Sequence, residues 1–428
     1  MSDLNFDTLA VHEGIQRGHG ESIGTPIHAV AAFQFETLEE MADVFQGREE
    51  GYQYARIQNP TLAALEARLA ALEVARSAVV TSTGQSATLL ALIALAKAGD
   101  HIVATNTLFG GSLGLLNVVL PGFGITATLA ENNPASLEMA IQPNTRAILV
   151  ETVGNPALDV PDFDALVRIA RAHEIALIVD NTWGAAGALC QPLALGADIV
   201  VESLTKWASG HGSVMGGAVL TRVGYVPNAP AFNDPDATGV SLNSRHGDKA
   251  FAVRARYLGL HQMGMTLSPH SAWQINQGLE TLSLRMARES QTACDLAAWL
   301  EAQPAIAWVS HTSRPDHPFY AAAQRYLRCQ PSVLTFGVKG GQAGASHFLG
   351  SLKLILLAAN LGDTRSLAAH PWTTTHGRLQ EGAKLKAGVK PEMIRLTVGL
   401  EDFTDLKRDL EQALATVALE TRETVASV

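Results

Sequence analysis

The chain has 428 residues, of which 47% are hydrophobic and 17% are charged, and it carries a formal net charge of -10 at pH 7. This composition excludes a disordered or fibrous protein, because the apolar fraction is large enough for a buried core. The acidic excess argues against a nucleic-acid-binding protein, which needs a basic surface. The length is sufficient for two or three domains.

The cysteines and the N-terminus predict a protein of the reducing cytoplasm. Cys190, Cys294 and Cys329 are widely spaced and form no CxxC pair, so neither a disulfide framework nor a metal site is expected. The first residues lack the basic and apolar regions of a signal peptide. The most apolar stretch, residues 87–96, is too short to cross a membrane, which takes about 20 residues.

Residues 1–60 are predicted to form an arm that packs on a neighbouring subunit. They are rich in glycine and polar residues and show no sustained hydrophobic period, apart from one short helix expected over 38–46. An arm of this kind buries little surface by itself, which is why we expect it to contact a second chain.

Residues 61–265 are predicted to form an α/β domain. Strand patterns alternate with helix patterns, and this order is typical of a mostly parallel sheet with helices on both faces. Helices are expected at 61–75, 86–97, 111–119 and 162–173, and strands at 78–81, 101–104, 146–151, 176–180, 198–203 and 217–221.

Residues 266–428 are predicted to form a smaller α+β domain. A long helical stretch over 269–302 opens it, and strands at 332–338 and 394–398 bracket a further helix. A last helix is expected over 404–419.

Polar residues follow three of the predicted strands, at the edge where an open α/β sheet binds its ligands. Gly84 and Gln85 come after strand 78–81 and begin a helix, whose free amides can bind an anion. Asp180 ends an apolar strand, where a carboxylate is costly unless it meets a cation. Taken alone, the first pattern also fits an ordinary turn and the second a helix cap or a salt bridge.

Lys206 follows the next strand, between the hydroxyl residues Ser203 and Thr205 and the following Trp207. A desolvated lysine has a lowered pKa and can form a Schiff base with a carbonyl. In this order the three patterns match a pyridoxal phosphate (PLP) site. Lys206 would bond the cofactor's aldehyde and Asp180 would keep its pyridine nitrogen protonated, while Gly84, Gln85, Ser203 and Thr205 would hold its phosphate.

Motifs along nearly the whole chain carry a resemblance to one enzyme family. They are YAR at 54–56, NPT at 59–61, ETVGNP at 151–156, VDNT at 179–182, SLTKW at 203–207, QGLETL at 277–282, HP at 370–371 and IRLTVG at 394–399. With them the chain resembles the Cys/Met-metabolism family of PLP enzymes, and within it the O-acetylhomoserine sulfhydrylases and γ-lyases. The resemblance implies the aspartate aminotransferase-like fold, which is PLP fold type I.

The resemblance also implies roles for individual residues. Tyr54 and Arg56 are expected to reach the phosphate of a neighbouring subunit, which makes a dimer the minimum and a tetramer the usual assembly. Arg395 is expected to grip the substrate carboxylate. The predicted catalytic residues are Lys206, Asp180 and Phe109; the cofactor-binding residues are Tyr54, Arg56, Gly84, Gln85, Phe109, Asn155, Asp180, Thr182, Ser203, Thr205 and Lys206; and the substrate-binding residues are Arg395, Asn155, Asn360 and Glu202.

The implied reaction is γ-elimination or γ-replacement on an O-substituted homoserine, through a Schiff base on Lys206 and a vinylglycine-type intermediate. Two alternatives remain open. One is a β-lyase with the same cofactor, and the other is a catalytically silent regulatory homologue, although the complete set of Asp180, Lys206 and Arg395 argues against the latter.

Three residues depart from the family pattern. Phe109 stands where the family has a tyrosine, so its ring can stack on the cofactor but has no hydroxyl for proton transfer. Glu202 stands where histidine is common, and Trp372 replaces a small residue. An added carboxylate could favour a cationic substrate such as canavanine, which is O-guanidino-homoserine; the other interpretation is neutral drift in a sulfhydrylase.

Overall fold

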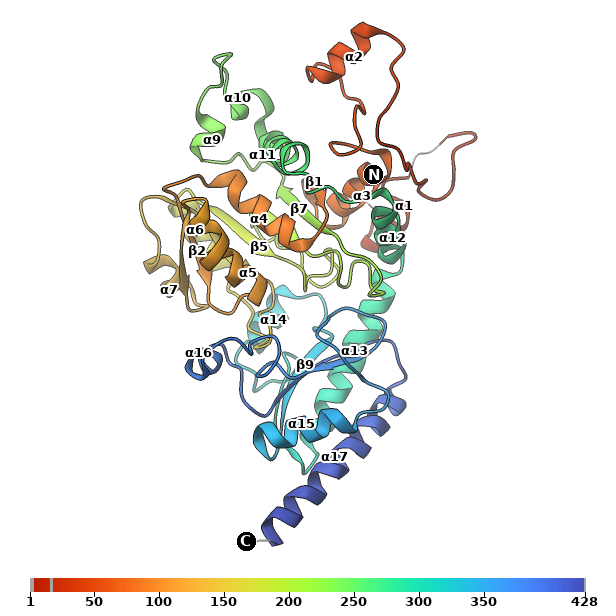
Figure 1. Ribbon diagram of the computed structural model, residues 1–428, viewed down its shortest axis with the longest axis vertical. Helices are drawn as coiled ribbons and strands as arrows, with labels where there is room; N and C mark the ends of the chain where they lie inside the picture. Colours follow the sequence, from red (N-terminus) through yellow and green to blue (C-terminus); the bar gives the residue numbers. More distant parts are fainter. Residues whose placement is uncertain (1–3, 16–17, 427–428) are drawn as a thin grey trace.

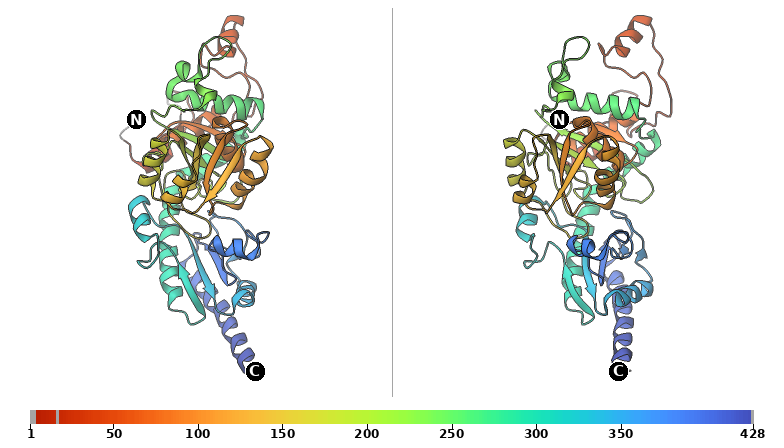
Figure 2. Two further views of the ribbon diagram at one scale, coloured as in Figure 1. Left: turned by 90° about the vertical axis from the view of Figure 1, so that its left-hand side faces the viewer. Right: turned by 60° about the vertical axis from the view of Figure 1, so that its left-hand side comes forward.

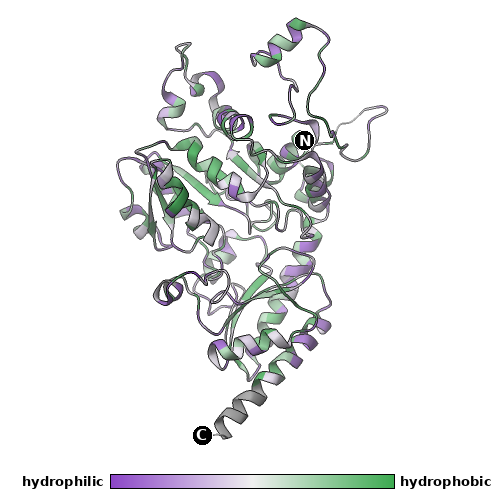
Figure 3. Cartoon of the chain, in the orientation of Figure 1, coloured by the Kyte–Doolittle hydropathy of each residue, from purple (hydrophilic) through white to green (hydrophobic). Residues whose placement is uncertain are grey.

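The computed structural model describes residues 4–15 and 18–426. It contains a seven-stranded sheet and a five-stranded sheet, which lie in two stacked units (Figure 1). Figure 3 shows that hydrophobic residues predominate in the strands of both sheets. No described helix is both long and apolar enough to cross a membrane.

The larger sheet has the strand order β1-β7-β6-β5-β4-β2-β3. The run from β6 to β3 is parallel, which confirms the predicted α/β fold, whereas β7 is antiparallel to both its neighbours. β3 was not predicted, because this edge strand is only partly buried and has no apolar run. The strands are β1 (Ala75–Thr81), β2 (His101–Thr105), β3 (Thr126–Ala130), β4 (Thr145–Glu151), β5 (Ala176–Asp180), β6 (Ile199–Glu202) and β7 (Gly217–Arg222).

Helices cover both faces of this sheet and make two separate hydrophobic cores. One core contains residues of α3 (Pro60–Leu72) and α8 (Phe163–Ala172), and the other contains residues of α4 (Gly84–Leu95) and α11 (Ala250–Ala255). The smaller helices of this unit are α5 (Gly110–Gly114), α6 (Leu120–Gly122), α7 (Pro134–Met139), α9 (Pro230–Asn233) and α10 (Leu242–His246), with π-helical turns at Leu115–Val119 and Arg256–Gln262 and a 3-10 turn at Gly247–Lys249.

The helical stretch predicted over 269–302 is two helices, α12 (Pro269–Glu280) and α13 (Leu282–Glu301), which meet at Thr281. The prediction of one helix was wrong because periodicity continues across the break. Residues of α12 pack against α3 and belong to a core of the larger unit. α13 runs on into the smaller unit, as Figures 1 and 2 show.

The smaller sheet has the order β10-β11-β12-β9-β8, and its core contains residues of α13, α15 and α17. The two predicted strands correspond to β9 and β12, and the final helix is confirmed as α17. The elements are β8 (Ile306–Ser310), α14 (Tyr320–Tyr326), β9 (Val333–Val338), α15 (Gly341–Ser351), β10 (Leu356–Leu357), β11 (Leu367–Ala369), α16 (Glu381–Lys386), β12 (Met393–Thr397) and α17 (Phe403–Ala426).

The N-terminal segment divides into two parts. α1 (Phe6–His12) contacts α3 and α12 of its own chain, and Ala10 lies in the core. The segment that carries α2 (Leu38–Phe45) stands away from the body of the molecule in Figures 1 and 2. On it Ile23 is 94% exposed and Leu38 is 76% exposed. The division at residues 60 and 265 stays a prediction.

Gly278 in α12 should be intolerant of a side chain. A Cβ atom at this position would lie 2.6 Å from the backbone oxygen of Ala208, just after Lys206. Because the obstacle is backbone, we expect Gly278→Ala to destabilise the protein by about 1–3 kcal/mol, measured by urea unfolding. The matched control is Gly350→Ala in α15, where no atom lies within 4 Å and alanine should be neutral or stabilising. Equal stabilities for the two variants would contradict this prediction.

Candidate active site

Lys206 lies in the turn after β6, between the two units. Its ammonium nitrogen donates a hydrogen bond to Asn360 Oδ1 at 2.5 Å, across the interface with the smaller unit. Burial lowers the pKa of Lys206, and the positive charge of Arg395 lowers it further. A lower pKa increases the neutral fraction of the amine, which is the form that attacks a carbonyl.

Asp180 ends β5 and is held by Thr182. The backbone N–H and the hydroxyl of Thr182 both donate to Asp180 Oδ1, at 3.0 and 2.6 Å. The hydroxyl of Thr182 also accepts a hydrogen bond from the N–H of Ser203, which ties the end of β5 to the end of β6. Burial raises the pKa of Asp180 while the bonds from Thr182 lower it. Since both bonds go to Oδ1, Oδ2 is available for a cationic N–H donor.

An anion cradle forms where α4 begins. The hydroxyl of Thr83 caps the helix by accepting from the N–H of Ser86. A Cβ atom on Gly84 would lie 2.6 Å from the Cβ of Ser203, so glycine is required for this close approach. The approach places the hydroxyl of Ser203 beside the free amides of a helix N-terminus, an arrangement that suits a phosphate. The hydroxyl of Thr205 bonds instead to the backbone of Gly216 and holds the turn.

The ring of Phe109 stands at the rim of this cradle. Its backbone N–H donates to Glu151 Oε1 at 2.6 Å, and its side chain is 47% exposed. A Cβ atom on Gly111 would meet both the ring of Phe109 and the amide of Gln85, so these residues are neighbours. The ring is therefore fixed by its backbone while its face stays free to stack.

Arg395 on β12 is a buried cation with an unused donor. It donates from Nη1 to Asn155 Oδ1 at 3.0 Å and from Nη2 to the backbone oxygen of Asn360 at 3.3 Å. Its Nε is buried and has no partner among the described residues. Burial lowers the pKa of Arg395 to about 10, so the side chain remains charged at neutral pH. A substrate carboxylate would satisfy this donor and charge.

Tyr54 and Arg56 are not brought to Lys206 within one chain. The guanidinium of Arg56 lies over the ring of Tyr54, 5.4 Å from its centroid, and donates to the backbone oxygen of His261. Both residues lie just after the projecting segment, and Tyr54 is 44% exposed. Their action on a neighbouring subunit stays a prediction.

The prediction that Glu202 contacts the substrate is wrong. Its carboxyl group is buried beside that of Glu73, and the amide of Asn181 donates to both. Neighbouring side chains in a strand point to opposite faces, so Glu202 points away from the face that Ser203 presents.

Trp372, the third departure from the family pattern, is also buried in the protein interior. It is buried in a small cluster with Val389 and Met393, and the ammonium of Lys384 lies 4.7 Å from its ring centroid. Of the three departures from the family pattern, only Phe109 faces the predicted cofactor.

Glu151, the last residue of β4, is a further site residue that has no role in the sequence-based prediction. This buried carboxyl accepts a hydrogen bond from the backbone N–H of Phe109 at 2.6 Å, and the backbone of Asn155 also lowers its pKa, so it lies between two site loops. Burial is the main cause that raises the pKa of Glu151 well above its usual range, and Asp180 adds to the shift. The available signal was an acidic residue ending an apolar strand, the same pattern that identified Asp180.

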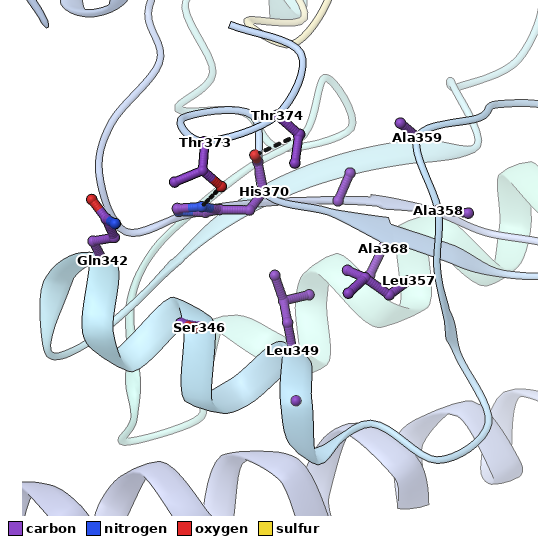
Figure 4. Close-up of a pocket in the computed structure, with 12 residues that line it drawn as sticks. Gln342, Ser346, Leu349, Leu357, Ala358, Ala359, Ala368, His370, Thr373 and Thr374 are labelled. Atoms are coloured by element: carbon purple, nitrogen blue, oxygen red, sulfur yellow. Dashed lines mark hydrogen bonds between the residues drawn. The ribbon is translucent and has the colours of Figure 1, made fainter. Parts of the chain in front are cut away.

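A cavity of about 450 Å³ lies in the smaller unit beside the segment that leads to Asn360 (Figure 4). Gln342 and Ser346 of α15 line one side, and His370, which is hydrogen-bonded to Thr373, lines another. Ala358 and Ala359 also line it, and the N–H of Ala358 donates to the backbone of β11. This bond anchors the segment that presents Asn360 to Lys206.

These residues fit PLP. The free oxygen of Asp180 suits the pyridinium nitrogen, the cradle at Gly84 suits the phosphate, and the amine of Lys206 suits the aldehyde. The orphaned Nε of Arg395 adds a site for the substrate carboxylate.

The sequence is similar to known enzymes over nearly its whole length. A model of the Cys/Met metabolism PLP-dependent enzyme family matches residues 7–415. The chain is 44% identical to O-acetyl-L-homoserine sulfhydrylase 1 of Thermus thermophilus, an alignment that covers 96% of this chain and 100% of that protein. It is 39% identical to the homocysteine synthase of Schizosaccharomyces pombe, with 96% and 98% covered.

Solved structures show the same fold. A putative O-acetylhomoserine (thiol)-lyase from Campylobacter jejuni has a TM-score of 0.92 and 35% identity over 96% of this chain and 100% of that one, and its crystal structure contains N'-pyridoxyl-lysine-5'-monophosphate. The cystathionine gamma-lyase of Lactobacillus plantarum, complexed with L-serine, has a TM-score of 0.84 and 31% identity, with 97% and 100% covered. This chain therefore belongs to the PLP-dependent enzymes of cysteine and methionine metabolism.

Proposed function

We propose that this enzyme is an O-acetylhomoserine sulfhydrylase, which replaces the acetate of O-acetylhomoserine with sulfide and forms homocysteine and acetate. The observation that carries this proposal is the 44% identity to the Thermus thermophilus sulfhydrylase over 96% of the chain. The homocysteine synthase of Schizosaccharomyces pombe supports the same reaction.

The site residues have distinct tasks in this reaction. Arg395 and Asn155 bind the substrate carboxylate and so orient the Cα–H bond. Lys206, whose pKa is lowered, takes the proton from Cα and can return it further along the substrate chain. Bound PLP supplies an electron sink, and Asp180 keeps its ring nitrogen protonated. Asn360 holds the amine of Lys206 in place through the 2.5 Å hydrogen bond.

The missing hydroxyl at Phe109 is consistent with an acetyl leaving group. Acetate leaves Cγ as a stabilised carboxylate and needs no proton at that moment, whereas a thiolate or amine leaving group benefits from a general acid. Canavanine would need the carboxylate of Glu202 in the site to bind its cationic group, but that carboxyl group lies buried beside Glu73. Canavanine therefore loses its structural support.

We also propose that two chains complete each site and that the enzyme acts in the cytoplasm. The projecting segment exposes Ile23 and Leu38, and apolar surface of this kind is typical of a subunit interface. Tyr54 and Arg56 follow that segment and would supply a hydroxyl and a cation to the phosphate of the neighbouring chain. The thiols of Cys190, Cys294 and Cys329 are free, as expected in a reducing compartment.

The substrate assignment is tested with the purified holoenzyme. O-acetylhomoserine with sulfide should give homocysteine and acetate, identified by mass spectrometry, and canavanine should not be consumed. Lys206→Ala should abolish both turnover and the yellow absorbance of bound cofactor, because no other described amine can replace it in the turn after β6. Pyruvate formation would indicate a β-lyase, and absence of turnover with all substrates would indicate a silent homologue; either result would contradict the proposal.

The variant Phe109→Tyr tests the role of the leaving group. With O-acetylhomoserine and sulfide we expect kcat to change by less than about threefold, because acetate departure needs no acid. With cystathionine, whose thiolate leaving group benefits from a proton, we expect an increase of about tenfold or more. The control is Phe109→Leu, which removes the stacking ring and should weaken cofactor binding. A large gain with O-acetylhomoserine would show that its cleavage is limited by the missing acid.

The shared site is tested by mixing two inactive variants. Arg56→Ala removes the cation expected to act on the partner, and Lys206→Ala removes the amine of the same chain. Random reassembly of equal amounts makes half of the dimers mixed, each with one intact site, so activity should return to about a quarter of the wild type. If Arg56 acted within its own chain, every site in a mixed dimer would carry one defect and no activity would return.

A further inference from the structure

We propose that Glu73 and Glu202 share one proton in a buried carboxyl pair, and that this pair locks the ends of β5 and β6 from behind the cofactor site. Glu73 is the C-cap residue that directly follows α3, and Glu202 is the last residue of β6. Neither residue has a role in the reaction proposed above. The proposal of a shared proton therefore does not depend on which leaving group the substrate carries.

The geometry brings the two carboxyl groups together on one amide. Both residues are buried, at 0% and 2% exposure, and both accept from the same nitrogen, Asn181 Nδ2. An ionised carboxylate can only accept, whereas a protonated carboxyl group can donate to its ionised neighbour. Oε2 of each residue is buried and receives no donor from the described residues, which leaves these oxygens for the shared proton.

The surrounding donors hold one carboxylate charge but are too few for two. Asn181 Nδ2 donates to Glu73 Oε1 at 2.6 Å and more weakly to Glu202 Oε1 at 3.4 Å, and the backbone of Ala186 lowers the pKa of Glu202. Among the described residues, Arg328 is the cation whose charge acts on the pair, and it lowers the pKa of Glu73. Two negative charges buried beside the same amide would repel each other strongly and would lack hydration.

The other titratable groups near the pair add no positive charge. The charge of Asp180, on the opposite face of the sheet, raises the pKa of Glu202 further. The thiol of Cys190 lies near Glu73 and is kept protonated, because burial raises its pKa far above its usual range. Its backbone oxygen accepts from Asn181, so the loop after β5 is part of the same cluster.

The cluster is connected to the cofactor residues through the backbone. Asn181 directly follows Asp180, and Glu202 directly precedes Ser203. On the other side of these strand ends, Thr182 joins Asp180 to Ser203. Glu73 and Glu202 are therefore positioning residues, because they fix the spacing of the two chain segments that carry Asp180 and Lys206.

The shared proton gives the protein a defined pH dependence. Burial raises the pKa of Glu73 to about 7. Burial and the charge of Glu73 together raise the pKa of Glu202 well above its usual range. Between these two values the folded protein keeps one proton that the unfolded chain releases, since glutamate ionises near 4.3 when unfolded. Because the folded-state pKa values are raised, this stabilisation is complete at acidic pH and falls as pH rises through them.

The variant Glu202→Gln tests this pair in the holoenzyme. Its amide can donate to an ionised Glu73, so no shared proton is needed. Between pH 7 and 9 the unfolding equilibrium constant of the wild type should rise relative to that of the variant by about tenfold per pH unit, the effect of one linked proton. Glu138→Gln, which removes an exposed carboxylate on α7, is the control and should follow the wild type.

Infrared spectroscopy gives a direct readout. At pH 8 the wild type should show the carbonyl band of a protonated carboxyl that Glu202→Gln lacks, and Glu138→Gln should keep the band. Glu202→His, whose ring can donate to an ionised Glu73, gives the same comparison if the glutamine variant does not fold. Equal band intensity in the wild type and in the folded variant would overturn the shared proton.

The positioning role is measured by cofactor retention. As pH is raised from 7 to 9, the wild type should lose the absorbance of bound PLP on dialysis at a lower pH than Glu202→Gln does. Retention curves that coincide would overturn the connection to the cofactor site, even if the pair shares a proton.

Discussion

The burial of two positive side chains next to each other is the constraint on which the site depends. Lys206 and Arg395 lie close enough for the charge of Arg395 to lower the pKa of Lys206, and both are also shifted by burial. The neighbours that bind them, Asn155 and Asn360, offer neutral oxygens and no counter-charge. Such an arrangement is costly in isolation and becomes favourable when anions bind. A cofactor with a phosphate and a substrate with a carboxylate supply those anions.

The two-unit architecture follows from the same requirement. The larger unit supplies Asp180, the cradle at Gly84 and the turn with Lys206, whereas the smaller unit supplies Arg395 on β12 and Asn360 in the segment between β10 and β11. Hydrogen bonds between Lys206 and Asn360, and between Arg395 and Asn155, join the units across the site. The groups proposed to bind cofactor and substrate therefore come from different units, and only the packing of these units brings them together.

The buried carboxyl groups differ in the partners that are available to stabilise a negative charge. Asp180 has two donors from Thr182 and a free oxygen for a cationic partner, so it can stay ionised once the cofactor binds. Glu151, Glu73 and Glu202 form no ion pair among the described residues, and burial raises the pKa of each. Three carboxyl groups at strand ends thus have different roles according to their neighbours: Asp180 as an ion, Glu151 as a backbone acceptor, and Glu202 in the proposed pair with Glu73 at the end of α3.

The sequence by itself determined the α/β fold, the cofactor and the reaction class, and it predicted the site residues Lys206, Asp180 and Arg395, because strand periodicity and short motifs are local properties. The tertiary structure decided the direction of β7, the break at Thr281 and the places of Glu202 and Trp372. Glu202 precedes a predicted phosphate-binding residue in the chain, yet its side chain points to the opposite face and meets Glu73, which is distant in sequence. The direction of a side chain and the partner that it meets are set by packing between remote segments, and spacing along the chain does not contain that information.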